Sequence, residues 1–150
     1  MNVADVMSRD PACCTPDTSL QDVARMMVEN DCGAIPVVNS MQDMKPVGMI
    51  TDRDITVRAV AQGKNPLGMT AGECMSQPPI TIGEQESLDD CEELMKEHQI
   101  RRVIVLDKQG RCCGIVTQAN LARKASDEEI AGVVREISQP HHHAAPHAKM

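Results

Sequence analysis

The sequence predicts an α+β fold of two pseudo-symmetric repeats, each with the element order β-α-β-β-α. The first observation is a repeated motif, since "GMITDRDI" at 48–55 and "GIVTQANL" at 114–121 share a glycine, two apolar residues and a threonine in the same order. The second is that two further pairs of segments match at an offset of 68. These pairs are "DVMSRDP" (5–11) with "ECMSQPP" (73–79), and "CGAIPVV" (32–38) with "IRRVIVL" (100–106). The third is that strand and helix patterns follow the same order in both halves.

The first half is expected to begin with a short strand at 13–15 and a helix at 19–30. The helix is indicated by an apolar stripe at i, i+3, i+4 and i+7 spacing. This stripe is Leu20, Val23, Ala24 and Met27. Thr18 and Gln21 have the spacing of a capping box at the start of the helix.

The strands "AIPVV" and "PVGMI" follow, and Thr51 stands where it would cap a second helix that Gly63 ends. The second half repeats this order. Thr81 lies in its short strand, Ser87 caps its first helix, and Thr117 caps its last helix. Two strands between these helices flank the turn "DKQG".

Each half is too small to bury a large core alone, so the two repeats are expected to pack sheet to sheet. A helix after the second repeat carries an apolar stripe that needs a partner surface, in this chain or in another copy. The stripe is Ile130, Val133, Val134 and Ile137, with Glu129 completing its cap. The expected organisation is repeat 1 at 1–62, a linker at 63–70, repeat 2 at 71–125, the C-terminal helix at 126–138, and a disordered His-rich tail at 139–150.

Composition restricts the function. Hydrophobic residues make up 41% of the 150 residues and none is aromatic, so the core must consist of aliphatic residues, methionine and cysteine. The net charge of −7 and the absence of stacking side chains argue against nucleic-acid binding. No apolar run reaches the length of a membrane span and no signal-peptide pattern opens the chain. A cytoplasmic protein with no membrane partner is therefore expected.

The seven cysteines include two adjacent pairs, Cys13–Cys14 and Cys112–Cys113, but no CxxC pattern or zinc-finger spacing. Reduced thiols that serve as small core residues are the simplest interpretation. No metal ligands are assigned.

Two motifs of the form G-h-h-T-x-x-[D/N]-h, where h is aliphatic, make residues 1–124 resemble a tandem pair of cystathionine-β-synthase (CBS) domains, the Bateman module. The stretch "TDRDITVRAVAQGKNP" is similar to stand-alone CBS-pair proteins of bacteria and archaea. The resemblance implies a non-catalytic regulatory module and a homodimer. Its ligand would be an adenosine compound (AMP, ADP, ATP, NAD or S-adenosylmethionine), with AMP or ATP favoured, and it would act on an unknown partner protein.

The motif suits a nucleoside chemically. Its glycine would let a ligand approach the backbone, the Thr51 hydroxyl would reach a phosphate, and the Asp54 carboxylate would accept from both ribose hydroxyls. A purely structural interpretation is also open, because a threonine with Asp54 or Asn120 three residues later is an ordinary helix cap. Thr117 and Asn120 form the corresponding pair without the charge.

Phosphates require positive charge, and Arg53 lies inside the first motif while Arg101 and Arg102 open the central strand of the second half. One half thus carries the acid and the other the arginines, so a single cleft is expected to fill first. The expected ligand-binding residues are Thr15, Gly33, Ala34, Ile35, Pro36, Thr51, Arg53, Asp54, Thr81, Arg101, Arg102, Thr117 and Asn120.

Three alternatives stay open. An enzyme is disfavoured because no nucleophile stands beside a histidine in a catalytic pattern. A metal-responsive or redox-responsive module would use the cysteines, with Arg111 next to Cys112 and Cys113, or the histidines at 141–143. The third alternative is an interaction module with empty clefts.

Overall fold

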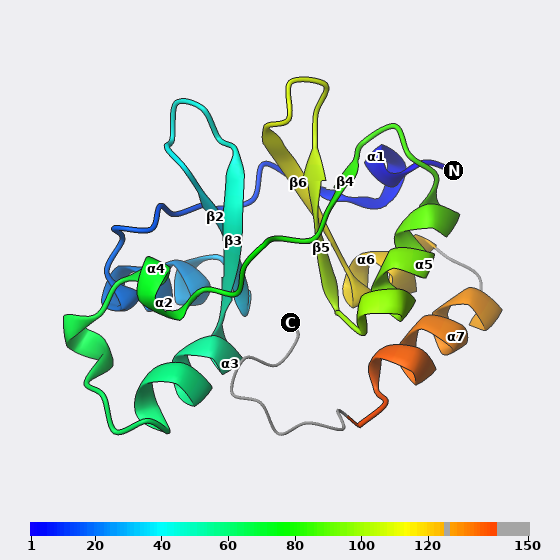
Figure 1. The fold of residues 1–150 in the computed structure, drawn as a ribbon. Helices are drawn as coiled ribbons and strands as arrows, with labels where there is room; N and C mark the ends of the chain where they lie inside the picture. Colours follow the sequence, from blue (N-terminus) through cyan, green and yellow to red (C-terminus); the bar gives the residue numbers. More distant parts are fainter. Residues whose placement is uncertain (125–126, 141–150) are drawn as a thin grey trace. The chain divides into compact units, whose positions relative to one another are not determined.

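The computed structural model describes residues 1–124 and 127–140 (Figure 1). It divides into two compact units, which we call the first unit (residues 11–79) and the second unit (residues 1–10 and 80–140). The units differ from the two halves of the sequence, because the first ten residues pack with the second half of the chain.

The first unit is built around a two-stranded antiparallel sheet. Its elements are α2 (Leu20–Glu29), β2 (Ala34–Val38), β3 (Pro46–Thr51), α3 (Asp52–Ile55), the π-helical turn η1 (Thr56–Val60), the 3-10 turn η2 (Pro66–Gly68) and α4 (Ala71–Cys74). Two single bridges widen the sheet, one between Cys14 and Val37 and one between Met49 and Ser76. The two predicted strands and the helix that precedes them are confirmed.

The second unit has a four-stranded sheet in the order β1-β6-β5-β4. Its elements are α1 (Val3–Val6), β1 (Ser8–Arg9), β4 (Thr81–Gly83), α5 (Leu88–His98), β5 (Arg102–Leu106), β6 (Cys112–Thr117), α6 (Gln118–Lys124) and α7 (Asp127–Ile137). Strands β4 and β5 are parallel, and the other pairs are antiparallel.

The two units share one arrangement in which the outermost segment comes from the other half of the sequence. Ser8 pairs with Ile115 beside β6, and Ser76 pairs with Met49 beside β3. In Figure 1 the blue N-terminal segment accordingly lies with the yellow strands of the second half. The matched segments 5–11 and 73–79 therefore each complete the sheet that holds the motif of the opposite half, which the sequence comparison did not foresee.

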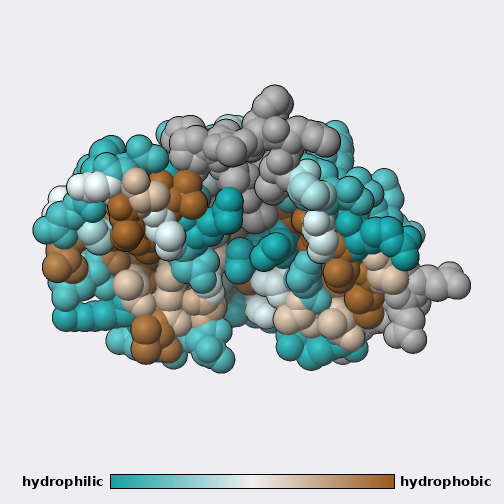
Figure 2. Space-filling view, turned by 90° about the horizontal axis from the view of Figure 1, so that it is seen from below, coloured by the Kyte–Doolittle hydropathy of each residue, from teal (hydrophilic) through white to brown (hydrophobic). Residues whose placement is uncertain are grey.

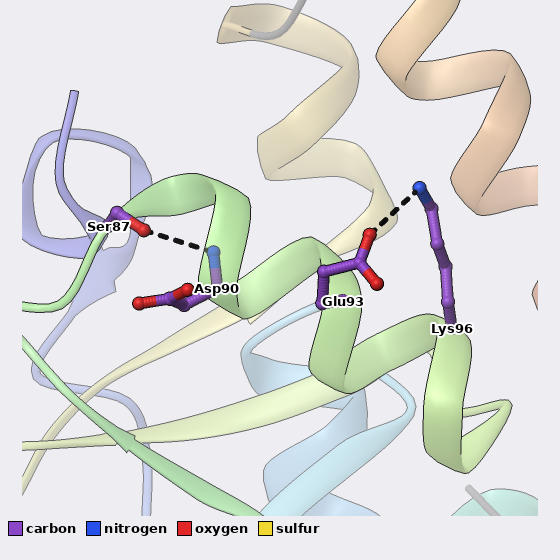
Figure 3. Close-up of polar contacts among 4 residues, drawn as sticks. All are labelled: Ser87, Asp90, Glu93 and Lys96. Atoms are coloured by element: carbon purple, nitrogen blue, oxygen red, sulfur yellow. Dashed lines mark hydrogen bonds and ion pairs between the residues drawn. The ribbon is translucent and has the colours of Figure 1, made fainter.

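Serines begin the long helices of both units. The Oγ of Ser87 accepts from the backbone N–H of Asp90 at 3.1 Å (Figure 3), and Ser19 accepts in the same way from Asp22. The predicted capping box of Thr18 and Gln21 is wrong, because the Thr18 hydroxyl accepts from the backbone N–H of Thr15 in the preceding turn instead.

Each unit encloses its own cluster of buried apolar side chains. In the first unit the cluster includes Leu20, Val23, Ile35, Val37, Ile50 and Ala59. In the second it includes Met95, Val103, Val105, Val116, Leu121, Val133 and Ile137. Methionine and cysteine take part in both clusters, as expected for a core without aromatic rings.

Helix α7 finds its partner surface within the chain. Val133 and Ile137 are buried against the second unit, where α7 packs on α5 and α6, while Val134 stays 40% exposed. The stripe therefore needs no second copy of the chain. The predicted cap by Glu129 concerns a side chain outside the described part, and so does the tail from 141 onward. Among the described residues, no helix has the length and apolarity to cross a membrane.

Candidate functional site

The first motif forms a reciprocal cap where β3 passes into α3. The Oγ1 of Thr51 accepts from the backbone N–H of Asp54 at 3.0 Å, and Oδ2 of Asp54 accepts from the backbone N–H of Thr51 at 2.9 Å. Both side chains are buried, with 5% of Asp54 exposed. The predicted cap by Thr51 is confirmed, and it places a carboxylate in the interior.

A second set of contacts holds the other oxygen of this carboxylate. The Oγ of Ser76 donates to Oδ1 of Asp54 at 3.1 Å and accepts from Nη2 of Arg58 at 3.3 Å. The Nη1 of Arg58 donates to the backbone carbonyl of Cys74 at 2.9 Å and to that of Met75. Arg58 thus holds the end of α4, with Ser76 between it and the acid.

Burial governs the ionisation of Asp54. Removal from water raises the pKa of the Asp54 carboxyl above 3.8, its ordinary value. The hydrogen bond from the Thr51 backbone, the positive charge of Arg58 and the Ser76 hydroxyl each lower this pKa but do not outweigh burial. The site therefore carries a carboxylate in a place that disfavours its charge.

The second motif forms the corresponding cap with a neutral residue. Oδ1 of Asn120 accepts from the backbone N–H of Thr117 at 2.8 Å and from the Thr117 hydroxyl at 2.9 Å. Nδ2 of Asn120 donates to Oγ of Ser8 at 3.0 Å. Asn120 and Ser8 therefore repeat the arrangement of Asp54 and Ser76, with the direction of donation reversed.

The motif glycines make room for the protein's own chain. A Cβ on Gly48 would lie 2.7 Å from Sδ of Met75 and 2.8 Å from the backbone oxygen of Ser76. A Cβ on Gly114 would likewise lie 2.5 Å from Sδ of Met7 and 3.0 Å from the backbone oxygen of Ser8. The close neighbour of each glycine was expected to be a ligand, but in the structure it is the segment from the opposite half of the sequence, 73–79 or 5–11, which we call the exchanged segment.

The strands bring some of the predicted residues together. Ala34 is the cross-strand partner of Thr51, and Arg102 is the partner of Thr117, so each pair shares one face of its sheet. Ile35 points the other way, into the core cluster of the first unit. Asp54 and Arg102 belong to different units, and the expectation that both contact one ligand stays a prediction.

The other predicted residues have local roles or lie at the surface. Arg53 and Arg101 are exposed. The Thr15 hydroxyl lies 3.3 Å from that of Thr18, and Thr81 is the register partner of Ile104 in the sheet. The backbone carbonyl of Gly33 accepts from the N–H of Asp52 at 3.0 Å.

Sequence reasoning missed Ser76 and Ser8 as partners of the motif. The available signal was the Met-Ser dipeptide that both matched segments share, "VMS" and "CMS". Arg58, which lies one helical turn after Asp54, donates hydrogen bonds to Cys74, Met75 and Ser76, and its positive charge acts on Asp54.

Burial raises the pKa of the Cys14, Cys74, Cys91 and Cys113 thiols and so favours their protonated form. It raises the pKa of Cys14 and Cys91 to about 12 and that of Cys113, which faces Glu84, to about 11. The idea of a reactive thiolate at Cys113 is therefore wrong, because such a site needs a lowered pKa. The described residues contain no group of three side chains arranged to hold a metal ion.

The model of the family "CBS domain" matches this sequence twice, over residues 3–60 and 71–127. The chain belongs to the CBS domain family. Hypoxic response protein 1 of Mycobacterium tuberculosis is 35% identical over 136 residues, which cover 91% of this chain and 93% of that CBS protein. Protein MK0525 of Methanopyrus kandleri is 35% identical over 121 residues, 81% of this chain, and the chain spans 61% of its length.

Solved CBS structures share the fold. Hypoxic Response Protein I with two coordinated zinc ions has 34% identity and a TM-score of 0.74, covering 84% of this chain and 100% of that one. The CBS pair of MJ0100, in complex with 5′-methylthioadenosine and S-adenosyl-L-methionine, has 31% identity and a TM-score of 0.72, covering 82% and 98%. CBSX2 in complex with AMP has 26% identity and a TM-score of 0.71, covering 83% and 95%.

One CBS relative is named as an enzyme. L-aspartate semialdehyde sulfurtransferase of Methanocaldococcus jannaschii is 31% identical over 121 residues. These residues are 81% of this chain but 22% of that protein, so the similarity concerns a minor part of the enzyme.

Proposed function

We propose that this CBS pair is a non-catalytic regulatory module that binds an adenosine compound and transmits its presence to a partner protein. The structures of CBSX2 with AMP and of MJ0100 with two adenosine derivatives support this ligand class. The buried thiols of Cys14, Cys74 and Cys91 favour a reducing compartment such as the cytoplasm.

The observation that carries the proposal is the difference between Asp54 and Asn120. Both side chains cap a helix and form a hydrogen bond with a serine of the exchanged segment, Ser76 in the first unit and Ser8 in the second. In the second unit a neutral amide is sufficient for both contacts. The first unit instead keeps a buried carboxylate whose charge the surroundings disfavour. A charge kept at a cost to stability indicates a function for that charge.

A carboxylate is suited to the ribose of a nucleoside. Each oxygen of Asp54 has one hydrogen bond in the structure, and a carboxylate oxygen can accept two. The remaining capacity fits two adjacent hydroxyl donors. Asn120 has one acceptor oxygen, which already accepts from both the Thr117 backbone and the Thr117 hydroxyl.

We assign the ribose contact to Asp54 with Thr51, and the phosphate contacts to Arg53 and to one of Arg101 and Arg102. The backbone at 33–36 and the side chains of Ala34 and Pro36, with Thr15 and Thr81, would line the base, and Ile35 would contribute backbone atoms alone because its side chain lies in the core. Thr117 and Asn120 would form a second, weaker site that fills after the first or stays empty.

Calorimetric titration of AMP, ATP and S-adenosylmethionine into the parent protein and two variants tests this assignment. Asp54→Asn should bind at least tenfold more weakly, because a charged hydrogen bond is about twice as strong as a neutral one. Asn120→Ala, the matched control, should bind nearly as the parent does. Equal affinity of the Asp54→Asn and parent proteins would remove Asp54 from the site.

Zinc binding is a second candidate, favoured by the two zinc ions coordinated in Hypoxic Response Protein I. Candidate ligands lie outside the described residues, at His141–His143 and His147. Removing the chain after Gln139 should abolish zinc binding if the tail supplies the ligands. Unchanged zinc affinity after truncation would assign the metal to the CBS repeats.

We also propose a homodimer, with the interface on the helices of the first unit. Val28 of α2 and Lys96 of α5 occupy equivalent positions in the two repeats, because each lies the same number of residues after the N-cap of its helix, Ser19 or Ser87. Lys96 is partly covered by α7, since a Cβ at Gly132 would lie 3.8 Å from its Nζ and 33% of its side chain is exposed, whereas Val28 is 82% exposed. Figure 2 shows hydrophobic residues among hydrophilic ones on the surface of the unit that contains α2 and α3.

The sequence offers two apolar stripes compatible with a dimer interface, at 55–59 and at 130–137, and both need correction. Ala59, the last residue of the first stripe, is completely buried in the core of the first unit. The exposed large hydrophobic residues on the helical elements of this unit are Val28, Val60 and Leu67. These residues carry the proposal in place of Ala59 and α7.

A further inference from the structure

The exchanged segment of the first unit is anchored to the sheet at Ser76. Its backbone N–H donates to the carbonyl of Met49 at 2.8 Å, and its own carbonyl accepts from the N–H of Met49 at 3.0 Å. This pair of bonds fixes the Cα of Ser76 beside β3. Gly48, which precedes Met49 in that strand, lets the segment approach this closely.

The side chain of Ser76 is fixed as well. It stands between the guanidinium of Arg58, from which it accepts at 3.3 Å, and the carboxylate of Asp54, to which it donates at 3.1 Å. A hydroxyl has a single proton to donate. The proton of Ser76 is therefore directed at Oδ1 of Asp54.

We propose that Ser76 is a positioning residue, held by Arg58, that keeps the Asp54 carboxylate oriented and ionised for the ligand. This inference rests on the proposed function of Asp54 and extends it, since it assigns a role to a residue outside the motif. It also ties the ligand site to the segment that leads into β4.

Orientation follows from the two bonds on opposite oxygens. Oδ2 is held by the backbone N–H of Thr51 and Oδ1 by Ser76, so the plane of the carboxylate cannot turn without breaking one of them. The second lone pair of each oxygen is then left in a fixed direction. Without Ser76, the Thr51 contact alone would hold the carboxylate.

Ionisation follows from the charges around Asp54. Arg58 on η1 favours the carboxylate, the Cys74 thiol on α4 is a further titratable group that interacts with it, and burial opposes the charge. The Ser76 hydroxyl acts with Arg58 by hydrogen bonding the charged form. Loss of this hydroxyl should therefore raise the pKa of Asp54 further.

The second unit offers a matched control. Ser8 occupies the position of Ser76 beside the other sheet and contacts Asn120, whose amide has no proton to lose near neutral pH. Ser8→Ala removes the same hydroxyl from the same kind of segment. It should cost comparable stability without affecting any titration of the site.

The test uses the full chain as parent, Ser76→Ala and Ser8→Ala. Titration of AMP between pH 5 and 8 should show about tenfold weaker binding for Ser76→Ala, as expected when the partner that orients a binding group is lost. When the pH is lowered, the affinity of Ser76→Ala for AMP should begin to fall at a higher pH than that of the parent. Ser8→Ala should keep the parental affinity and pH profile.

Carboxyl ¹³C chemical shifts of the ligand-free proteins supply an independent readout. The midpoint for Asp54 should lie at higher pH in Ser76→Ala than in the parent and in Ser8→Ala. An unchanged midpoint, or an equal shift in both variants, would overturn the positioning role. A shifted midpoint in a protein whose parent binds no adenosine compound would support the positioning role and reject the proposed function.

Discussion

Asn120 ties the first strand of the chain to the start of α6, because its Nδ2 donates to the Oγ of Ser8 at 3.0 Å. The two residues are 112 positions apart in sequence. In the first unit the corresponding contact runs from Ser76 to Asp54 with the donor and acceptor exchanged. One structural task is thus performed by an amide in one repeat and by a buried acid in the other.

Asp54→Asn should make the protein more stable at neutral pH. Burial raises the folded-state pKa of Asp54 above 3.8, so between these two pKa values the folded chain holds a proton that the unfolded chain has released. Stability then falls as the pH rises through this window, and the loss persists at pH 7. An asparagine can make the contacts seen for Asn120 without this loss.

Calorimetric melting of the parent and of Asp54→Asn between pH 3 and 8 checks this expectation. The gain in Tm should be largest at neutral pH and should shrink toward pH 3. Asn120→Asp is the converse variant and should melt lower at neutral pH than the parent. A lower Tm for Asp54→Asn at pH 7 would show that the carboxylate stabilises the fold.

Gly48→Ala should destabilise the first unit by about 1–3 kcal/mol, the usual cost of overpacking a core. The added methyl would meet Sδ of Met75 at 2.7 Å and the backbone oxygen of Ser76 at 2.8 Å. Gly68→Ala is the control, because nothing lies within 4 Å of its Cβ position. Urea unfolding followed by far-ultraviolet circular dichroism measures both variants, and a tolerated Gly48→Ala would contradict the close approach.

The local elements of this fold are readable from sequence because their signals are local. Ser87 and Thr117 each begin a helix by bonding the residue three positions on, and the apolar stripe of α5 recurs with helical spacing. Thr51 and Asp54 were found for the same reason. These features depend on neighbours within one or two turns of chain.

The contacts that complete the site could not be read in this way. Ser76 lies 22 positions from Asp54, and Ser8 lies 112 positions from Asn120, so no local period connects them. The repeated sequences "VMS" and "CMS" identify two equivalent segments, but they do not indicate which half of the chain provides the strand that each segment pairs with. The role of Gly48 stayed hidden as well, because its close neighbour belongs to the exchanged segment.

Val28→Lys should convert a dimer into a monomer. The substitution introduces the residue type that occupies the corresponding position 96, which α7 covers only in part. Burying a valine contributes about 1.5–3 kcal/mol, and a symmetric dimer loses it twice, so association should weaken more than a hundredfold. Val134→Lys, on the exposed side of α7, is the control and should leave association unchanged. Light scattering that finds the parent monomeric near 16 kDa at micromolar concentration would refute the dimer.

AMP should bind more tightly than adenosine if arginines meet the phosphate. Arg102 lies across the strand pair from Thr117, and Arg53 is exposed on α3 one position before Asp54. A charge-assisted contact contributes about 1.5–3 kcal/mol, so AMP should bind roughly ten- to a hundredfold more tightly than adenosine. If the arginine–phosphate contact is exposed to water, the affinity difference between AMP and adenosine should become smaller as salt is added.

Replacing one arginine at a time shows which of them accounts for the higher affinity for AMP than for adenosine. Arg102→Gln or Arg53→Gln should lower the affinity for AMP toward that for adenosine while leaving adenosine itself nearly unaffected, because a nucleoside has no phosphate to lose. Arg25→Gln is the matched control, since Arg25 lies on the surface of α2 with a side chain 66% exposed and pairs with Asp22 at 3.7 Å. A reduced preference in Arg102→Gln alone would place the phosphate beside Thr117, and one in Arg53→Gln alone would place it beside Asp54. Equal calorimetric affinities of the parent for AMP and adenosine would exclude phosphate recognition and leave the ribose contact of Asp54 to account for binding.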